Sequence, residues 1–217
     1  MKRITFFASA SIALAMLTGC KSTPTNISQI DGVSIDYEVN DRVTGDTYQV
    51  VSITTIPNVE YEIKLPNGKT KKIIDNIPLT LSGVADMTGK IIVPLEYHHI
   101  MQPANGYFLV EMPSRPENYH YRGVYYKDGS IPVPVKYHSL DLDPEGRGAI
   151  AKISNPDGRT QQIYAYDFMN GNKQTLLPFN DLSGSIRNGK IYISSRRNPE
   201  NKFRDYYFDF SGNPVQE

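Results

Sequence analysis

The sequence predicts an all-β protein: a tandem β-repeat of about 41 residues per unit, open or propeller-like, with an N-terminal β cap. Three observations favour this class. From Gly32 onward the chain contains many short runs rich in Val, Ile, Tyr, Phe and Thr, and almost no helical periodicity. Gly, Pro, Asn and Asp separate these runs, as residues with turn chemistry do. Glycines also recur at a nearly constant spacing, which is typical of repeat architectures.

Residues 1–19 have the layout of a secretory signal. Lys2 and Arg3 form a positive start, and the apolar run that follows is shorter than the roughly 20 residues that span a bilayer. The run ends in Leu17-Thr18-Gly19-Cys20, which resembles the lipobox of bacterial lipoproteins. This resemblance implies that Cys20 becomes the N-terminus of the mature chain and carries diacylglycerol on its sulfur and an acyl chain, such as palmitate, on its amino group. The alternative is an ordinary signal peptide with an incidental cysteine.

The predicted lipid on Cys20 makes the membrane the first expected partner, because several buried CH₂ groups per acyl chain give a stable anchor. Residues 20–30, rich in Ser, Thr, Pro and Asn, are typical of a tether between lipid and fold. Lys21 stands where inner-membrane lipoproteins of Gram-negative bacteria usually have Asp. The resemblance therefore implies a cell-envelope location, at the outer membrane and facing the periplasm if the host is Gram-negative.

Charge and cysteine content exclude two classes of function. Removing the signal leaves 23 − 2 = 21 basic residues against 23 acidic ones, a net charge near −2. Such a charge predicts no nucleic-acid partner. Cys20 is the only cysteine, so the mature chain has neither a disulfide nor a catalytic thiol. The remaining 217 − 19 = 198 residues are enough for a substantial core.

Residues 31–80 form the predicted N-terminal β segment. Residues 48–55 are a predicted strand. Residues 59–65 alternate polar and apolar side chains. Pro66-Asn67-Gly68 are residues typical of a turn, and residues 69–74 follow as the returning strand. This pattern predicts a β-hairpin.

Residues 81–217 contain the predicted repeats. One glycine series has steps of 40, 42 and 41 residues, and each member follows an aromatic or apolar run: Gly89, Gly129, Gly171 and Gly212. A second series, with steps of 42 and 41, precedes apolar runs: Gly106, Gly148 and Gly189. Residues 83–97 align with residues 123–137, and Tyr97 and Tyr137 keep the 40-residue step.

These units resemble the WG-repeat (KWG-type) family, whose unit reads roughly Trp-Gly-Tyr-Ile-Asp-x-x-Gly-Lys-x-Val-Ile-Pro-x-x-Tyr-Asp. Residues 83–97 are the best copy, and the resemblance covers about residues 81–215. The chain has no Trp, and Ser82 and Arg122 stand at the family's Trp position. The resemblance implies short antiparallel strands that stack against neighbouring units, with glycines at positive φ in turns and the Pro-x-x-Tyr aromatic in the inter-repeat core.

The sequence predicts no catalytic residue, no metal site and no cofactor. His98 and His138 occupy equivalent repeat positions, which favours a structural role. Asp141-Leu142-Asp143-Pro144-Glu145-Gly146 imitates half a calcium loop, but Lys152 stands where that loop needs a bidentate Glu.

Two classes of function remain. The first is an envelope-anchored protein-binding or adaptor module, with an immunity protein against a secreted effector as a special case. Its predicted partner is an envelope or secreted protein, bound through Arg122, Tyr125, Arg196 and Arg197, because Tyr and Arg dominate interface energetics. A solvated loop is the alternative for Arg196 and Arg197. The second class is an envelope hydrolase that acts on wall or glycan with loop carboxylates.

Overall fold

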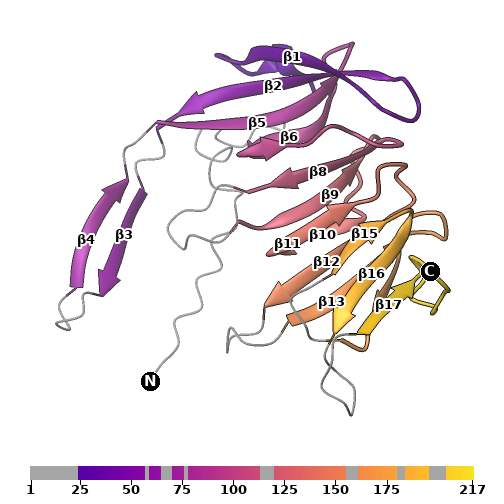
Figure 1. Ribbon diagram of the computed structural model, residues 1–217. Coiled ribbons are helices and arrows are strands. Elements are labelled where there is room, and N and C mark those ends of the chain that lie inside the picture. Colours follow the sequence, from indigo (N-terminus) through magenta and orange to yellow (C-terminus); the bar gives the residue numbers. More distant parts are fainter. Residues whose placement is uncertain are drawn as a thin grey trace.

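The computed structural model describes residues 24–56, 59–64, 70–75, 78–112, 120–154, 161–179, 184–195 and 204–217. Over these residues the chain forms strands and turns, with one short 3₁₀ helix at Ile27–Gln29. The strands build four antiparallel sheets and a separate hairpin (Figure 1). The predicted all-β class is therefore confirmed.

The first sheet has the strand order β1-β2-β5-β6. Its strands are β1 (Ser34–Asn40), β2 (Thr47–Thr55), β5 (Leu79–Asp86) and β6 (Ile91–Tyr97). The strand predicted at residues 48–55 is β2. The predicted boundary at residue 80 falls inside β5, so the N-terminal β segment supplies the first two strands of this sheet.

The predicted hairpin lies between β2 and β5 in the chain. Its strands β3 (Val59–Lys64) and β4 (Thr70–Asp75) pair antiparallel, which confirms the prediction. Figure 1 shows the hairpin extending away from the four sheets. Its predicted turn at residues 66–68 lies outside the described residues.

Each of the other three sheets is an antiparallel meander of strands that follow one another in the chain. The second contains β7 (His99–Ile100), β8 (Tyr107–Glu111), β9 (Arg122–Tyr126) and β10 (Val133–Tyr137). The third contains β11 (Ser139–Leu142), β12 (Gly148–Ser154), β13 (Gln161–Asp167) and β14 (Lys173–Leu176). The fourth contains β15 (Gly184–Arg187), β16 (Lys190–Ser195) and β17 (Arg204–Phe208). In Figure 1 the sheets form a row from β1 and β2 at the top to β16 and β17 at the lower right.

Positive φ values occur at all four glycines of the first series, with φ between 73° and 90°. This confirms the prediction that these glycines sit in turns that other residues enter only with strain. In three of the turns the glycine N–H bonds to the carbonyl oxygen three residues earlier: Gly89 to Asp86, Gly129 to Tyr126 and Gly212 to Asp209. In the second series Gly106 and Gly189 have positive φ, but Gly148 lies within β12 and Gly146 takes the turn position instead.

Replacing Gly129 by Val is expected to lower the free energy of unfolding by about 1 to 3 kcal/mol. The cost is backbone strain, because φ is 90° and an added Cβ would meet only the Ile92 carbonyl oxygen, at 3.7 Å. Gly129→Asn is the matched control and should cost less, since Asn105, Asn172 and Asn188 already adopt positive φ. Urea titration measures both, and equal stability of Gly129→Val and the wild type would contradict this account of the turn.

Hydrophobic clusters lie between consecutive sheets. The first and second sheets share a cluster around Phe108, the second and third share one around Tyr137, and the third and fourth share one around Ile163 and Ile193. Among the described residues no such cluster joins the fourth sheet back to the first, and no closed propeller is found. The two end sheets therefore each have one face turned away from the row.

Tyrosine hydroxyls connect neighbouring sheets at the predicted Pro-x-x-Tyr positions. Tyr97 of β6 donates to the hydroxyl of Tyr125 in β9 over 2.8 Å. Tyr137 of β10 and Tyr166 of β13 share a bond of 2.6 Å, one sheet further along. Both pairs are buried, so Tyr97 and Tyr137 belong to the core between consecutive sheets.

Residues 25–33 pack on the outer face of the first sheet, over β2, β5 and β6. Ile27, Ile30 and Val33 pack against a cluster that includes Val51 and Leu95. The Ile27 N–H donates to the Gly89 carbonyl oxygen, and the Ile91 N–H donates to the Thr25 carbonyl oxygen, both over 2.9 Å. The second half of the predicted tether at residues 20–30 is thus folded onto the sheet.

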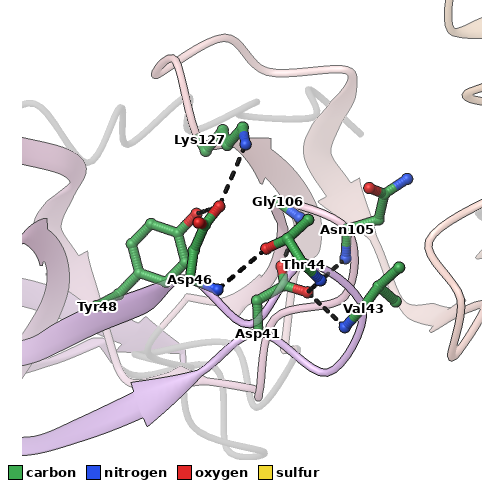
Figure 2. Close-up of polar contacts among 8 residues, drawn as sticks. All are labelled: Asp41, Val43, Thr44, Asp46, Tyr48, Asn105, Gly106 and Lys127. Carbon is green, nitrogen blue, oxygen red and sulfur yellow. Dashed lines mark hydrogen bonds and ion pairs between the residues drawn. The ribbon is translucent and has the colours of Figure 1, made fainter.

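Asp41 joins the turns of the first and second sheets (Figure 2). Asp41 is only 3% exposed as a residue. Its carboxylate accepts hydrogen bonds from the N–H groups of Val43 and Thr44 in its own turn and of Asn105 and Gly106 in the β7–β8 turn, over 2.6 to 3.0 Å. Burial alone would raise the pKa of Asp41, but these backbone donors hold it below its ordinary value.

Candidate partner-binding surface

The fourth sheet has one buried and one solvent-facing side because side chains alternate along its strands. Ile191 and Ile193 of β16 and Phe208 of β17 are buried against the third sheet. Tyr192 lies between the two isoleucines in sequence and therefore points the other way, and Tyr207 is its cross-strand partner. The last sheet of the row thus presents tyrosines on its outer face.

A two-residue turn positions Arg187 on the same face. Asn188 and Gly189 both have positive φ, 48° and 70°, as a tight hairpin turn requires. The turn pairs Arg187 with Lys190, so Arg187 is the diagonal neighbour of Tyr192. The Arg187 guanidinium carbon lies 3.6 Å from the centroid of the Tyr192 ring, a close cation–π contact.

Arg187 and Tyr192 form one outer surface, the tyrosine face, together with Asp205, Tyr207 and Glu217. The rings of Tyr192 and Tyr207 are 5.5 Å apart and tilted by 54°. The Tyr192 hydroxyl donates to Asp205 over 2.8 Å, and the Tyr207 hydroxyl donates to Glu217 over 3.0 Å. These bonds, with the ring contact, restrict the orientation of both tyrosine side chains.

A cavity of about 430 Å³ adjoins the tyrosine face, between β17 and the C-terminal segment. Its walls combine apolar and acidic side chains: Asp205, Tyr206, Tyr207, Phe208, Pro214, Val215 and Glu217. Partial burial, with the nearby Glu217 carboxylate as hydrogen-bond acceptor, raises the pKa of the Tyr207 hydroxyl. The Tyr207 hydroxyl thus acts as a hydrogen-bond donor at the edge of this cavity.

Arg122, a predicted partner-binding residue, lies in the second sheet and not on the tyrosine face. Its Nε is 2.8 Å from Glu111 Oε2, and His120 Nδ1 is 2.8 Å from Glu111 Oε1. The Arg122 side chain is 34% exposed, so its charge is partly accessible but already paired. An ion pair that solvent reaches from the arginine side contributes modestly to stability.

Tyr125, also predicted to bind the partner, is only 7% exposed and packs between the first and second sheets. Its hydroxyl accepts the bond from Tyr97, so an incoming protein cannot reach it without disrupting the core. Arg196, Arg197 and Cys20 lie outside the described residues. Of the described residues that the sequence selected for partner binding, neither Arg122 nor Tyr125 lies on the tyrosine face.

Sequence reasoning missed Arg187 and assigned Tyr192 and Tyr207 to packing within strands. One signal was available for Tyr192: the alternation Ile191-Tyr192-Ile193 places it opposite two core residues. The contact of Arg187 with this ring depends on the register of β15 against β16, which the sequence does not reveal.

The other candidate chemical groups have structural partners. The fully buried Asp143 carboxylate, part of the imitated calcium loop, binds Arg147 through Nε at 2.8 Å and Nη2 at 3.0 Å. His138 Nδ1 accepts the Ser154 N–H over 2.9 Å, and burial lowers the pKa of this histidine. Over the described residues no group of three potential metal ligands comes together.

Comparisons with protein-family models, with curated proteins and with solved structures find no match to this chain. Within the described part of the chain, no helix has the length and apolar character needed to cross a membrane.

Proposed function

We propose that this chain is an envelope lipoprotein that binds a protein partner through the tyrosine face. The observation that carries the proposal is the arrangement of Arg187 over Tyr192 beside Tyr207, on the outer side of an end sheet. Tyr and Arg are the residues that most often dominate the energetics of protein interfaces. Their rings and guanidinium are already held by neighbours, which reduces the entropy lost on binding.

The fold supports a binding role if the four sheets are copies of one unit of about 41 residues, as the resemblance to WG repeats implies. Two recurring features favour this. The same turn hydrogen bond occurs at Gly89, Gly129 and Gly212. A hydrogen bond between tyrosine hydroxyls of neighbouring sheets occurs at both Tyr97 and Tyr137. An open row of such units has two end faces. Residues 25–33 pack on one of them, and the other is the tyrosine face.

Lipidation at Cys20 completes the proposal, together with an outer-membrane location facing the periplasm if the host is Gram-negative. They rest on Leu17-Thr18-Gly19-Cys20 and Lys21. An immunity protein against a secreted effector is one form such a binding module takes. Its effector would then be the protein bound at the tyrosine face.

One observation favours a second candidate, the envelope hydrolase. Asp205 and Glu217 line the same cavity, and paired carboxylates are the catalytic groups of most glycosidases. Both residues are exposed to solvent, however, whereas the acid of such a pair needs an environment that holds its proton. Turnover of a cell-wall or glycan substrate that disappears in Asp205→Asn, with the fold intact, would favour this candidate over binding.

Replacing Arg187 by Ala is expected to weaken partner capture at least tenfold, which corresponds to roughly 1.4 kcal/mol. The change removes the cation from the Tyr192 ring without touching the buried side of the sheet. The measurement is cross-linking and pulldown of the tagged, full-length lipoprotein from envelopes, with quantitative mass spectrometry. Arg42→Ala, at an exposed arginine in the β1–β2 turn, is the matched control and should capture the partner as the wild type does. Equal capture by both variants would contradict the proposal.

A further inference from the structure

We infer that the outer face of the first sheet, on which residues 25–33 pack, lies against the bilayer surface, and that the tyrosine face points away from it. The inference rests on the lipid anchor at Cys20, which belongs to the proposed function. It assigns the two ends of the row of sheets to two different partners: lipid headgroups at one end and a protein at the other.

The length of chain between the anchor and the fold carries the first step. Only five peptide units separate Cys20 from Thr25, whose carbonyl oxygen accepts the Ile91 N–H of β6. At about 3.5 Å per residue, a fully extended chain of this length reaches roughly 18 Å. The first sheet therefore cannot move far from the lipid headgroups.

The attachment itself is rigid and cannot lengthen the tether cheaply. Asn26 caps the short helix by accepting the Ser28 N–H at 2.9 Å, and the Gln29 side chain accepts the N–H groups of Thr25 and Asn26. Asn26 also donates to the Thr88 carbonyl oxygen, and it forms a β-bridge with Lys90. Releasing residues 25–30 would break these bonds and expose the cluster of Val51, Ala85 and Leu95 on which Ile27 and Ile30 pack.

The turn that holds this segment suits a headgroup surface. Met87 is 51% exposed there, and Lys90 is exposed beside it. An apolar side chain next to a long cationic one matches the boundary between acyl chains and phosphate groups. The Asp86 carboxylate in the same turn already accepts the N–H groups of Thr88 and Lys90 and the Thr88 hydroxyl.

The tyrosine face is at the other end of the row, beyond the second and third sheets (Figure 1). Face-to-face sheets are spaced by about 10 Å, so the first and fourth sheets are separated by roughly 30 Å. A partner that binds the tyrosine face therefore approaches from the aqueous side and need not be a membrane protein.

Accessibility to a headgroup-bound relaxation agent tests the orientation. Cys20 is the only native cysteine, and a lipid thioether occupies its sulfur, so an introduced cysteine is the sole free thiol. Two variants of the full lipoprotein each carry one nitroxide label. Asp31→Cys places the label next to the first sheet, and Ser185→Cys places it on the outer side of β15. Each variant is placed in phosphatidylcholine vesicles that contain a Ni²⁺-chelating lipid. The label at 31 should be several-fold more accessible to the nickel lipid than the label at 185.

Insertion of 20 Gly/Ser residues after Ser22 provides the control. A flexible linker of this length has an r.m.s. span of about 25 Å, so the difference between the two labels should disappear. Equal or reversed accessibility in the uninserted chain would overturn the orientation while leaving the anchor intact. If the wild type behaves like Cys20→Ala and does not float with vesicles, the anchor fails and the inference fails with it.

Discussion

Replacing Asp41 by Ala is expected to lower the free energy of unfolding by about 3 kcal/mol, one of the largest effects of any single change in this chain. Four backbone N–H groups, at Val43, Thr44, Asn105 and Gly106, lose their acceptor. The site is almost inaccessible to water, so these donors find no equivalent partner. The loss also separates the turns of the first and second sheets.

Asp46→Ala is the matched control for Asp41. Asp46 lies in the same turn, but its side chain is about half exposed, and its contacts with Lys127 and Tyr48 span 3.3 Å. Urea titration should therefore show a far smaller change. If the two alanine variants unfolded at the same urea concentration, the buried hydrogen bonds would not hold the sheets together as described.

The same carboxylate gives stability a pH dependence of known sign. The pKa of Asp41 is lower in the folded chain than its ordinary value, so its stabilising effect is complete above the ordinary carboxyl pKa. The effect is lost as the pH falls through the lowered folded value. Asp167, which accepts bonds from Asn170 and Ser211, is shifted in the same direction. Asp41→Asn should accordingly unfold with a shallower dependence on acid pH than the wild type.

Replacing Cys20 by Ala is expected to abolish lipidation completely. In the proposed lipoprotein the Cys20 sulfur receives diacylglycerol, and alanine offers no nucleophile in its place. Metabolic labelling with a fatty-acid probe should mark the wild type and leave the variant unlabelled, as an uncleaved or released precursor. Ser22→Ala, two residues beyond the modified position, should incorporate label normally. Incorporation of label by Cys20→Ala would show that the lipobox assignment is wrong.

Local patterns predicted the local parts of this fold. The hairpin of β3 and β4 follows from alternation and turn residues, and the positive φ of Gly89 and Gly129 follows from their positions after apolar runs. The burial of Tyr97 and Tyr137 was predicted from their equivalent places in two aligned segments, residues 83–97 and 123–137. The hairpin is indicated by residues next to it in sequence, whereas the tyrosines required the comparison of two segments 40 residues apart.

Contacts between distant residues were beyond such patterns. Asp41 binds the Gly106 N–H across 65 residues of sequence, and nothing near Asp41 indicates that partner. Tyr125 and Tyr126 are adjacent and point to opposite faces, so composition alone could not reveal which one is buried. The folded state of residues 25–30 was hidden for a similar reason, because its partners Gly89 and Ile91 are some 60 residues away.

The central claim is that a protein partner binds the tyrosine face, and site-specific photo-cross-linking from that face tests it most directly. A photoreactive residue at Ser185, on the outer side of β15 beside Tyr192, is compared with one at Glu38, on the exposed strand β1 at the other end of the row. In whole envelopes, position 185 should yield a discrete cross-linked species that disappears in Arg187→Ala, and position 38 should not yield it. The same cross-link from both positions, or a cross-link from position 38 alone, would contradict the account.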